Sequence, residues 1–202
     1  MNKLKLHHKG LYHMLCLAVS IATAVIAWCA VSSMPDIGSV IVSPAQVWGA
    51  LVTNLSSGTL WIHIRDSLFR VIGGFLLGFF LSIPVAFLLG WYEGFRVIVE
   101  PWIQFLRTIP PIALIPIVIA TFGIGTSAKV AIIFFAVFLT MVITIYQGVK
   151  NVDATLIKAA RVFDANDAQI FFHVVVPAAI PFILTGVRLG LASALTTLVA
   201  AE

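Results

Sequence analysis

Charged residues are scarce in this sequence. Asp, Glu, Lys and Arg together make up 10% of its 202 residues, whereas hydrophobic residues make up 61%. A soluble domain usually carries about 25% charged residues, so the composition excludes a compact cytosolic enzyme. It also excludes a disordered chain, because disorder requires low hydrophobicity and high charge. The class that remains is a polytopic membrane protein, which we expect to be an all-α bundle of membrane helices.

Cysteines are few and catalytic motifs are missing. Cys16 and Cys29 are too few for a disulfide scaffold or a four-cysteine zinc site. The sequence contains no His-Glu-x-x-His pair, no Gly-x-Ser-x-Gly elbow and no Walker-type loop, which argues against a membrane-embedded enzyme. We therefore expect no catalytic residue, metal ligand or cofactor site in this chain. The apolar stretches also contain no carboxylate at mid-depth, as an ion-coupled transporter or channel acting alone would need.

Long apolar stretches are abundant instead. About 20 mostly apolar residues cross a hydrocarbon core as a helix. Five stretches reach or approach that length, at about 11–31, 67–90, 102–122, 130–149 and 174 to the end. The first is longer than the apolar core of a signal peptide, about 7–15 residues, so we interpret it as a membrane anchor. The expected divisions are a tail and first membrane helix (1–33), an external interfacial segment (34–66) and a membrane core (67–202).

The basic residues predict the orientation of these crossings, because cytoplasmic segments carry an excess of Lys and Arg. With the N-terminus inside, the cytoplasmic side holds Lys3, Lys5, Lys9, Arg96, Arg107, Lys150, Lys158 and Arg161. The opposite side holds the smaller set, Arg65, Arg70 and Lys129. We therefore expect a cytoplasmic N-terminus. Since these residues lie at the ends of apolar stretches and not in one patch, we expect no binding of nucleic acid.

Prolines and one arginine interrupt the apolar stretches. Pro110, Pro111 and Pro116 remove backbone donors near membrane depth, which favours an irregular segment that lines a cavity. Arg188 lies near the middle of the fifth stretch, where a charge costs about 2.5–3.5 kcal/mol and must face protein or water. These four residues are candidates for a translocation path. For Arg188, a purely structural role that ties helices together is equally compatible with the sequence.

Glycines in the second stretch predict close helix packing. Gly73, Gly74 and Gly78 follow the small-xxx-small pattern, which lets helix backbones approach each other in a membrane. A hinge that moves during transport is the alternative. In the external segment, Ser43-Pro44 predicts the start of an amphipathic helix at the membrane interface.

The loop 150–173 is long, charged and expected on the cytoplasmic side. Asp153 is a good N-cap, and Leu156, Ala160 and Phe163 follow at i, i+4 and i+7, which predicts a short helix with one apolar face. Such a helix either lies at the membrane interface and orients the chain, or provides a docking surface for a soluble partner. The periodicity alone does not decide between these two interpretations.

The residues of this loop resemble a known family. Lys158-Ala159-Ala160-Arg161-Val162-Phe163-Asp164, then nine residues, Val174, one residue and Val176-Pro177 is similar to the EAA motif of ABC-importer permeases. That motif reads Glu-Ala-Ala, three residues, Gly, nine residues, Ile, one residue and Leu-Pro. The stretches 105–116 and 176–188 resemble the subfamily that imports nitrate, sulfonates, taurine and related molecules. The resemblance covers about residues 40–202.

The resemblance implies a definite assembly. Two permease copies, as a homodimer, would form a path through the bilayer of the inner membrane, and an extracytoplasmic solute-binding protein would deliver the small solute. Two ABC ATPase subunits would bind from the cytoplasm, so that ATP is hydrolysed in those partners. The loop helix would be the coupling helix that docks in a cleft of the ATPase. The implied docking residues are Leu156, Lys158, Ala159, Ala160, Arg161, Phe163 and Asp164.

The sequence departs from the family pattern at three points. Lys158 stands where the family usually has Glu, and Asp164 stands where it usually has Gly. Asp adopts the left-handed backbone conformation more readily than most residues, so we expect the turn after the helix to be kept. Relatives typically continue through a further membrane helix, so the resemblance also implies that the final helix of the family is absent from these residues.

Overall fold

The computed structural model describes residues 2–34 and 40–201, with side chains described from Tyr12 onward. Within these residues all regular structure is helical. The helices are α1 (Asn2–Ser32), α2 (Pro44–Ser56), α3 (Thr59–Trp91), α4 (Glu93–Thr108), the 3₁₀ helix η1 (Pro111–Leu114), α5 (Ile115–Phe122), α6 (Thr126–Lys150), α7 (Ala154–Val162), α8 (Asp167–Ile170), the π-helix η2 (Phe171–Val175) and α9 (Val176–Ala201). The all-α fold class expected from the sequence is confirmed.

Some expected features lie outside the described residues. The side chains of Lys3, Lys5 and Lys9 are among them, as are positions 35–39 of the expected external segment and Glu202. The cytoplasmic placement of these lysines therefore stays a prediction.

Four helices in the described residues are long and apolar enough to cross a membrane. They are Tyr12–Ser32 within α1, α3, α6 and the continuous helical stretch Asp167–Ala201. Each overlaps a stretch predicted from the sequence. The predicted crossing at 102–122 is instead a pair, α4 and η1–α5, that is bent by 92° and passes the same test when taken together. The chain is thus a polytopic membrane protein with up to five crossings.

The chain divides into two compact units, Met1–Ile64 and Arg65–Glu202. In the first unit, the indole Nε1 of Trp28 in α1 donates a hydrogen bond of 3.0 Å to the carbonyl of Val42. Ser43 is the N-cap of α2 and forms a capping box with Gln46, followed by Pro44 at the first helical position. The predicted helix start at Ser43-Pro44 is confirmed, whereas its location at the membrane interface stays a prediction.

In the second unit, α3 and α6 pack side by side and run in the same direction. A Cβ added at Gly74 would lie 2.6 Å from Cγ2 of Ile133, and one added at Gly78 would lie 2.7 Å from Cγ1 of Val137. Further along both helices, Gly90 packs against Val149 in the same way. Residue numbers therefore increase in the same direction along both helices, which makes them parallel. Glycine is required at these contacts because any side chain would overlap the facing helix.

The glycine pattern predicted from the sequence is thus confirmed for two of its members. Gly74 and Gly78 face α6, whereas Gly73 has open space where its Cβ would be. The backbone contact that these two glycines allow supports a packing role.

The parallel arrangement of α3 and α6 requires the segment between them to cross the bundle. Arg70 of α3 lies with Thr126 at the start of α6, whereas Gly90 near the end of α3 lies beside Val149 near the end of α6. The chain must return from the second end to the first between Trp91 and Thr126. The bent pair α4 and η1–α5 makes this return, so it is a broken crossing and not a loop that re-enters on one side.

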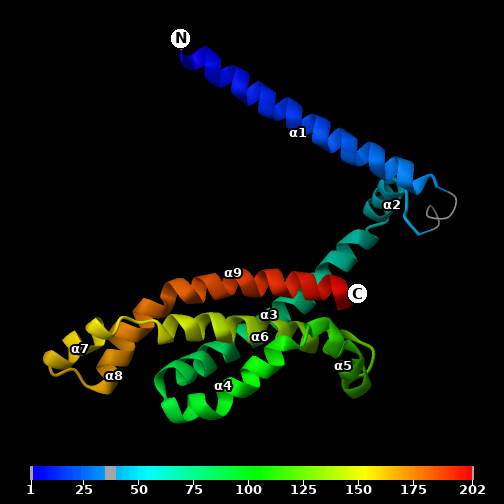
Figure 1. The fold of residues 1–202 in the computed structure, drawn as a ribbon. Coiled ribbons are helices and arrows are strands. Elements are labelled where there is room, and N and C mark those ends of the chain that lie inside the picture. The colour runs from blue at the N-terminus through cyan, green and yellow to red at the C-terminus, as the bar shows by residue number, and fades with distance from the viewer. Residues whose placement is uncertain (1, 35–39, 202) are drawn as a thin grey trace. The chain divides into compact units, whose positions relative to one another are not determined.

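The bend has a local cause in the prolines. Ile109 has extended backbone angles and ends α4, as is usual for a residue before proline. Pro110 has no N–H to continue the helical ladder, and Pro111 opens the short 3₁₀ helix that leads into α5. Figure 1 shows α4 and α5 on either side of this break. The irregular segment predicted from the prolines is confirmed. The size of the bend, 92°, could not be predicted from the sequence.

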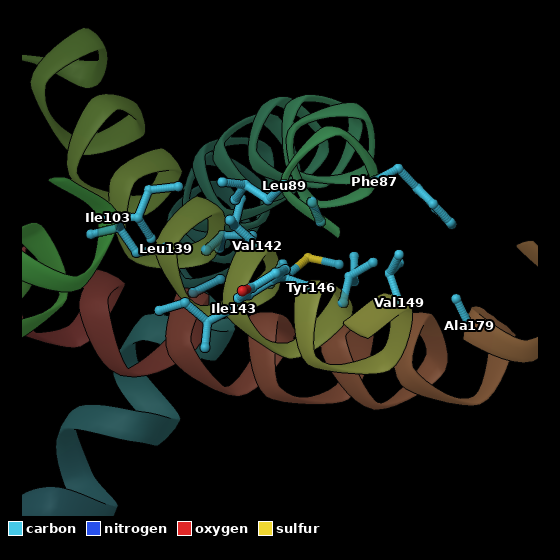
Figure 2. Packing of buried hydrophobic residues seen from close by; sticks show 14 of the residues in the cluster. Phe87, Leu89, Ile103, Leu139, Val142, Ile143, Tyr146, Val149 and Ala179 are labelled. Atoms are coloured by element: carbon cyan, nitrogen blue, oxygen red, sulfur yellow. The ribbon is translucent and has the colours of Figure 1, made fainter. Parts of the chain in front are cut away.

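Helix α9 lies antiparallel to α6 along its length, and Figure 1 shows the two side by side. Gly148 of α6 meets the ring of Phe182, and Gly190 of α9 meets the side chain of Met141. Figure 2 shows the buried core around α6, with Leu89 of α3 and Ala179 of α9 among its members. Helix α6 is therefore the central element of this unit.

Candidate functional site

The short helix α7 begins at the N-cap predicted from the sequence. The carboxylate of Asp153 accepts a hydrogen bond of 2.8 Å from the backbone N–H of Thr155. This backbone hydrogen bond, together with one from the side chain of Thr155, lowers the pKa of Asp153 below its usual value. A charged carboxylate at this position satisfies one of the free N–H groups at the start of the helix.

Helix α7 ends in a left-handed turn at Asp164, which has a φ of 59°. The N–H of Asp164 donates to the carbonyl of Arg161 at 3.0 Å, and the N–H of Ala165 donates to the carbonyl of Ala160 at 3.1 Å. This pair of bonds is a Schellman motif, which usually has glycine at the left-handed position. The expectation that Asp164 keeps the turn is confirmed.

Helix α7 packs against the bundle through two residues. Ile157 and Ala160 are half-buried against the core. Leu156 is 51% exposed and Phe163 is 86% exposed. Leu156, Ala160 and Phe163, which were expected on one apolar face, therefore do not share a side: Ala160 faces the bundle and the other two face outward.

The reason for the difference is geometric. The packed stripe of α7 lies midway between Ile157 and Ala160, so Leu156 falls at its edge. Phe163 follows the last helical residue and points away from the bundle. Lys158, Ala159 and Arg161 are also exposed. Helix α7 thus presents apolar side chains outward that no other described part of the chain covers.

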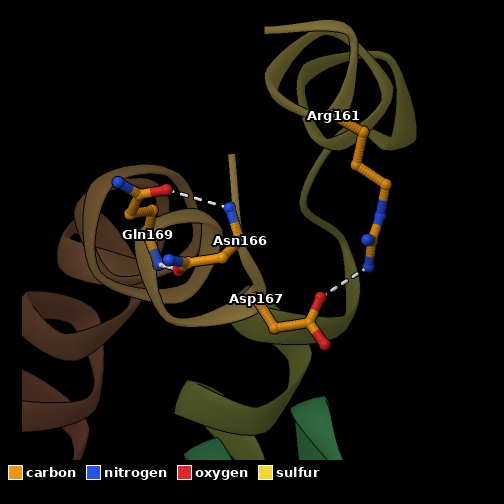
Figure 3. Close-up of polar contacts among 4 residues, drawn as sticks. All are labelled: Arg161, Asn166, Asp167 and Gln169. Carbon is orange, nitrogen blue, oxygen red and sulfur yellow. Dashed lines mark hydrogen bonds and ion pairs between the residues drawn. The ribbon is translucent and has the colours of Figure 1, made fainter. Parts of the chain in front are cut away.

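Polar contacts hold the turn between α7 and α8. A guanidinium nitrogen of Arg161 lies 2.6 Å from Oδ1 of Asp167, and both side chains are largely exposed. Asn166 caps α8 and forms a capping box with Gln169, in which each side chain accepts from the backbone N–H of the other. Figure 3 shows these contacts. Arg161, one of the implied docking residues, is therefore engaged within the chain.

Helix α8 and η2 fasten this loop to the end of α3. The ring of Phe171 meets Phe87 edge-on at 5.5 Å between centroids, and meets Trp91 edge-on at 5.4 Å. The aromatic contacts link the turn after α7 to the membrane helix α3. We call this end of the bundle the α7 end, and the end that holds Thr126 the Thr126 end.

A cavity of about 340 Å³ lies within the bundle between α4, η1, α6 and α9. It is lined by Arg107, Ile109, Pro111, Ala136, Leu139, Thr140, Ile143, Thr144 and Ser193. Of the residues predicted to lie on a translocation path, Pro111 lines this cavity. Pro110 and Pro116 shape the break beside it, at the start of η1 and of α5. Their role in transport stays a prediction.

Arg107 and Arg188 are both exposed in the isolated chain, and they differ in whether they line this cavity. Arg188 is exposed on α9 and is not among the lining residues of the cavity. Arg107, which the sequence suggested as a cytoplasmic charge at a helix end, lines the cavity beside Thr140 and Thr144. Thr140 lies near the middle of α6, whereas the expected placement of Arg107 on the cytoplasmic side stays a prediction. Arg107 lies one turn before Pro110 and Pro111, so the break after α4 sets its position beside α6.

Comparison with known proteins agrees with this architecture. A family model described as "Binding-protein-dependent transport system inner membrane component" matches residues 74–202. A probable ABC transporter permease protein of Brucella melitensis biotype 1 is 55% identical over 163 residues, which are 81% of this chain and 66% of that protein. The chain thus spans just under two thirds of the length of the first relatives it matches.

Several relatives carry names that specify a solute, among them permease proteins named for taurine, aliphatic sulfonates and nitrate. The taurine transport system permease protein TauC of Escherichia coli is 34% identical over 91% of this chain and 69% of its own length. The nitrate import permease protein NrtB of Synechocystis is 33% identical over 92% of this chain and 70% of its own length. These names describe permease proteins and not enzymes.

Proposed function

Because this chain belongs to the family of inner-membrane components of binding-protein-dependent transport systems, we propose that it is the permease subunit of an ATP-driven importer. The solute is a small molecule of the nitrate, sulfonate or taurine kind, as the names of the relatives suggest. The partners are ABC ATPase subunits, an extracytoplasmic solute-binding protein and a second copy of this chain. A transporter or channel acting alone is not favoured, because the relatives are named as ABC permeases.

The observation that carries this proposal is the exposed surface of α7. Leu156, Val162 and Phe163 are 51%, 83% and 86% exposed, although the helix is capped at both ends and packs against the bundle through Ile157. Apolar side chains on a fixed helix outside the membrane are typical of a surface that a protein partner covers. In this proposal the ATPase covers them, and its closure moves α7 and, through Phe171, α3.

The proposed orientation places the α7 end in the cytoplasm. That end carries Lys150, Lys158 and Arg161, whereas Arg65, Arg70 and Lys129 lie at the Thr126 end; Arg161 is paired with Asp167 and Arg65 with Asp66. Arg96, near the start of α4, which directly follows the end of α3, gives the α7 end the larger number of basic residues. With five crossings, the N-terminus of the chain is then also cytoplasmic.

The docking proposal is tested by replacing exposed side chains of α7. We expect Leu156→Ser with Phe163→Ser to weaken binding of the ATPase at least about thirtyfold, if each side chain contributes about 1 kcal/mol or more. Ala160 is less suitable, because it packs against the core. Binding is measured by co-purification and by titration of the ATPase onto the chain in nanodiscs.

The matched control is Ile124→Ser. Ile124 is 93% exposed at the Thr126 end, so its replacement removes a similar apolar side chain from the opposite end of the bundle. We expect it to leave ATPase binding unchanged. Equal ATPase binding by the parent and the α7 double variant would show that α7 is not the docking surface.

The orientation is tested separately with Ala159→Cys in a chain whose Cys16 and Cys29 are replaced by Ser. We expect a membrane-impermeant thiol reagent to label the thiol introduced on α7 in inside-out vesicles and not in intact cells. The reverse result would place α7 outside the cell and would rule out docking of a cytoplasmic ATPase there.

A further inference from the structure

The cavity between α4, η1, α6 and α9 is partly open, and its one ionisable lining residue, Arg107, is exposed in the isolated chain. The other polar lining groups are the hydroxyls of Thr140, Thr144 and Ser193. No carboxylate is among the lining residues, so the cavity has a net positive charge.

The energetic position of Arg107 is unusual. A guanidinium near the centre of a bilayer costs about 2.5–3.5 kcal/mol unless it faces water or a partner of opposite charge. Within the described residues the structure gives Arg107 no ion pair, and its five N–H donors are available. An anion in the cavity would offset this cost.

The hydroxyls around the cavity divide into two kinds. Thr140 donates to the carbonyl of Ala136 at 2.8 Å, and Thr144 donates to the carbonyl of Thr140 at 2.8 Å. The hydroxyl hydrogens of Thr140 and Thr144 are therefore used within α6, and these two side chains can only accept hydrogen bonds from a ligand in the cavity. Ser193 makes no such bond within the described residues, so its O–H is free to donate into the cavity. Arg107 on α4 and Ser193 on α9 therefore supply the donors from different helices.

We propose that this cavity is a transient anion subsite in which the guanidinium of Arg107 and the hydroxyl of Ser193 bind a small oxyanion on its way through the membrane. Guanidinium and oxyanion form charge-assisted, often bidentate, hydrogen bonds. The volume of about 340 Å³ is at the small end of the range of ligand sites, which suits a compact sulfonate or nitrate better than a large solute. The site lies beside the middle of α6, away from the depth of lipid headgroups. The proposal rests on the proposed importer function and adds the residues that hold the solute.

The charge of the cavity can be tested without any transport assay. Thr140→Cys is introduced into the chain that lacks Cys16 and Cys29, which are free thiols on α1. The rates at which this introduced thiol, the cavity thiol, reacts with an anionic and a cationic methanethiosulfonate reagent are measured in nanodiscs. We expect the anionic reagent to be favoured, and Arg107→Gln to reduce that preference at least about fivefold, because a unit charge within the cavity acts on both reagents with opposite sign.

The controls separate the cavity charge from other effects. Arg107→Lys keeps the charge and is expected to keep most of the preference for the anionic reagent. Lys129→Gln removes a positive charge near the Thr126 end and is expected to leave the preference unchanged. A preference unaffected by Arg107→Gln would overturn the subsite, and so would a failure of both reagents to reach the cavity thiol.

Uptake links the subsite to the proposed function. With the ATPase and binding protein present, we expect Arg107→Gln to reduce ATP-dependent uptake of labelled taurine or nitrate at least about tenfold, while co-purification of the ATPase is unchanged. If the parent complex takes up neither anion, the proposed solute class fails, and the ratio of the two labelling rates at the cavity thiol still decides whether the anion subsite exists. If the parent transports and Arg107→Gln transports equally well, the function stands and the subsite is wrong.

Discussion

Helices α6 and α7 follow each other in the chain and use their apolar side chains in opposite ways. Helix α6 is surrounded by α3, α5 and α9 and buries Val137, Val142 and Ile145 completely. Helix α7 buries no residue completely and leaves Val162 and Phe163 more exposed than most residues of the bundle. The apolar side chains of α6 are covered by other helices of the same subunit. Helix α7 packs on one side only, and its remaining apolar side chains are exposed. The comparison teaches that a helix can be capped and anchored to the bundle without being covered, and in our proposal the uncovered side of α7 is the surface that the ATPase covers.

The largest expected effect comes from the same substitution made in both helices. Val142→Asp places a carboxylate in the fully buried centre of the bundle, which we expect to destabilise the fold by about 3 kcal/mol or more. Val162→Asp adds the same group to an exposed position and should change stability by less than about 0.5 kcal/mol. The thermal unfolding midpoint of the purified chain in detergent measures both. Similar losses in the two variants would mean that α7 is as deeply packed as α6.

Adjacent glycines of α3 sharpen the comparison within the packed region. Gly74→Ala would drive its Cβ against the side chain of Ile133 and the carbonyl of Val130, and we expect a loss of about 1–3 kcal/mol. Gly73→Ala meets nothing within 4 Å and should be neutral or stabilise by up to about 1 kcal/mol. Unfolding midpoints compare the two variants directly. A hinge at these glycines would predict instead that both substitutions impair transport without loss of stability.

Much of this fold could be predicted from the sequence because each membrane helix is recognised from the length and composition of one continuous stretch. Apolar stretches of sufficient length predicted the membrane crossings, and Pro110 and Pro111 predicted the irregular segment. The parallel pairing of α3 and α6 could not be predicted in this way, since it depends on which faces of distant helices meet. The contact of Arg107 with the cavity beside α6 could not be predicted for the same reason, because it depends on the bend between α4 and α5.

Helix α7, the candidate docking helix, shows the same difference between features set by nearby residues and features set by distant helices. Its two ends were predicted correctly, because Asp153 and Asp164 act on backbone groups within a few residues of themselves. The sequence made no prediction of which side packs against the bundle, because the contacts of Ile157 and Ala160 depend on the surrounding helices and not on the period of α7. The capping box of Asn166 with Gln169 was missed, although Asn three residues before Gln is a readable signal.

The turn at Asp164 allows a smaller test of how α7 is held. Asp164→Gly removes the steric cost of a left-handed residue and is expected to stabilise the end of α7 by up to about 1 kcal/mol. Asp164→Val introduces a β-branched residue at the same φ and should destabilise it by about 1–2 kcal/mol. Amide hydrogen exchange of Phe163, Asp164 and Ala165 reports the local change. Equal protection in both variants would show that the Schellman turn does not fix this end of the helix.

The smallest expected effect is the pH dependence of the other end of α7. The pKa of Asp153 is lowered in the folded chain by the hydrogen bond from Thr155, so the cap stabilises α7 fully above the ordinary value of 3.8. This contribution is lost as the pH falls below 3.8 and through the folded pKa, where the carboxylate becomes protonated. A spin label on Ala159→Cys, in the chain without Cys16 and Cys29, should therefore become more mobile in that acidic range. Asp153→Asn keeps a capping oxygen but does not titrate there, so the difference between the two chains isolates this carboxylate from Asp164 and Asp167. An identical acid response in both chains would assign the change in mobility to those two residues. The carboxylate of Asp153 would then not be what holds the start of α7 in place.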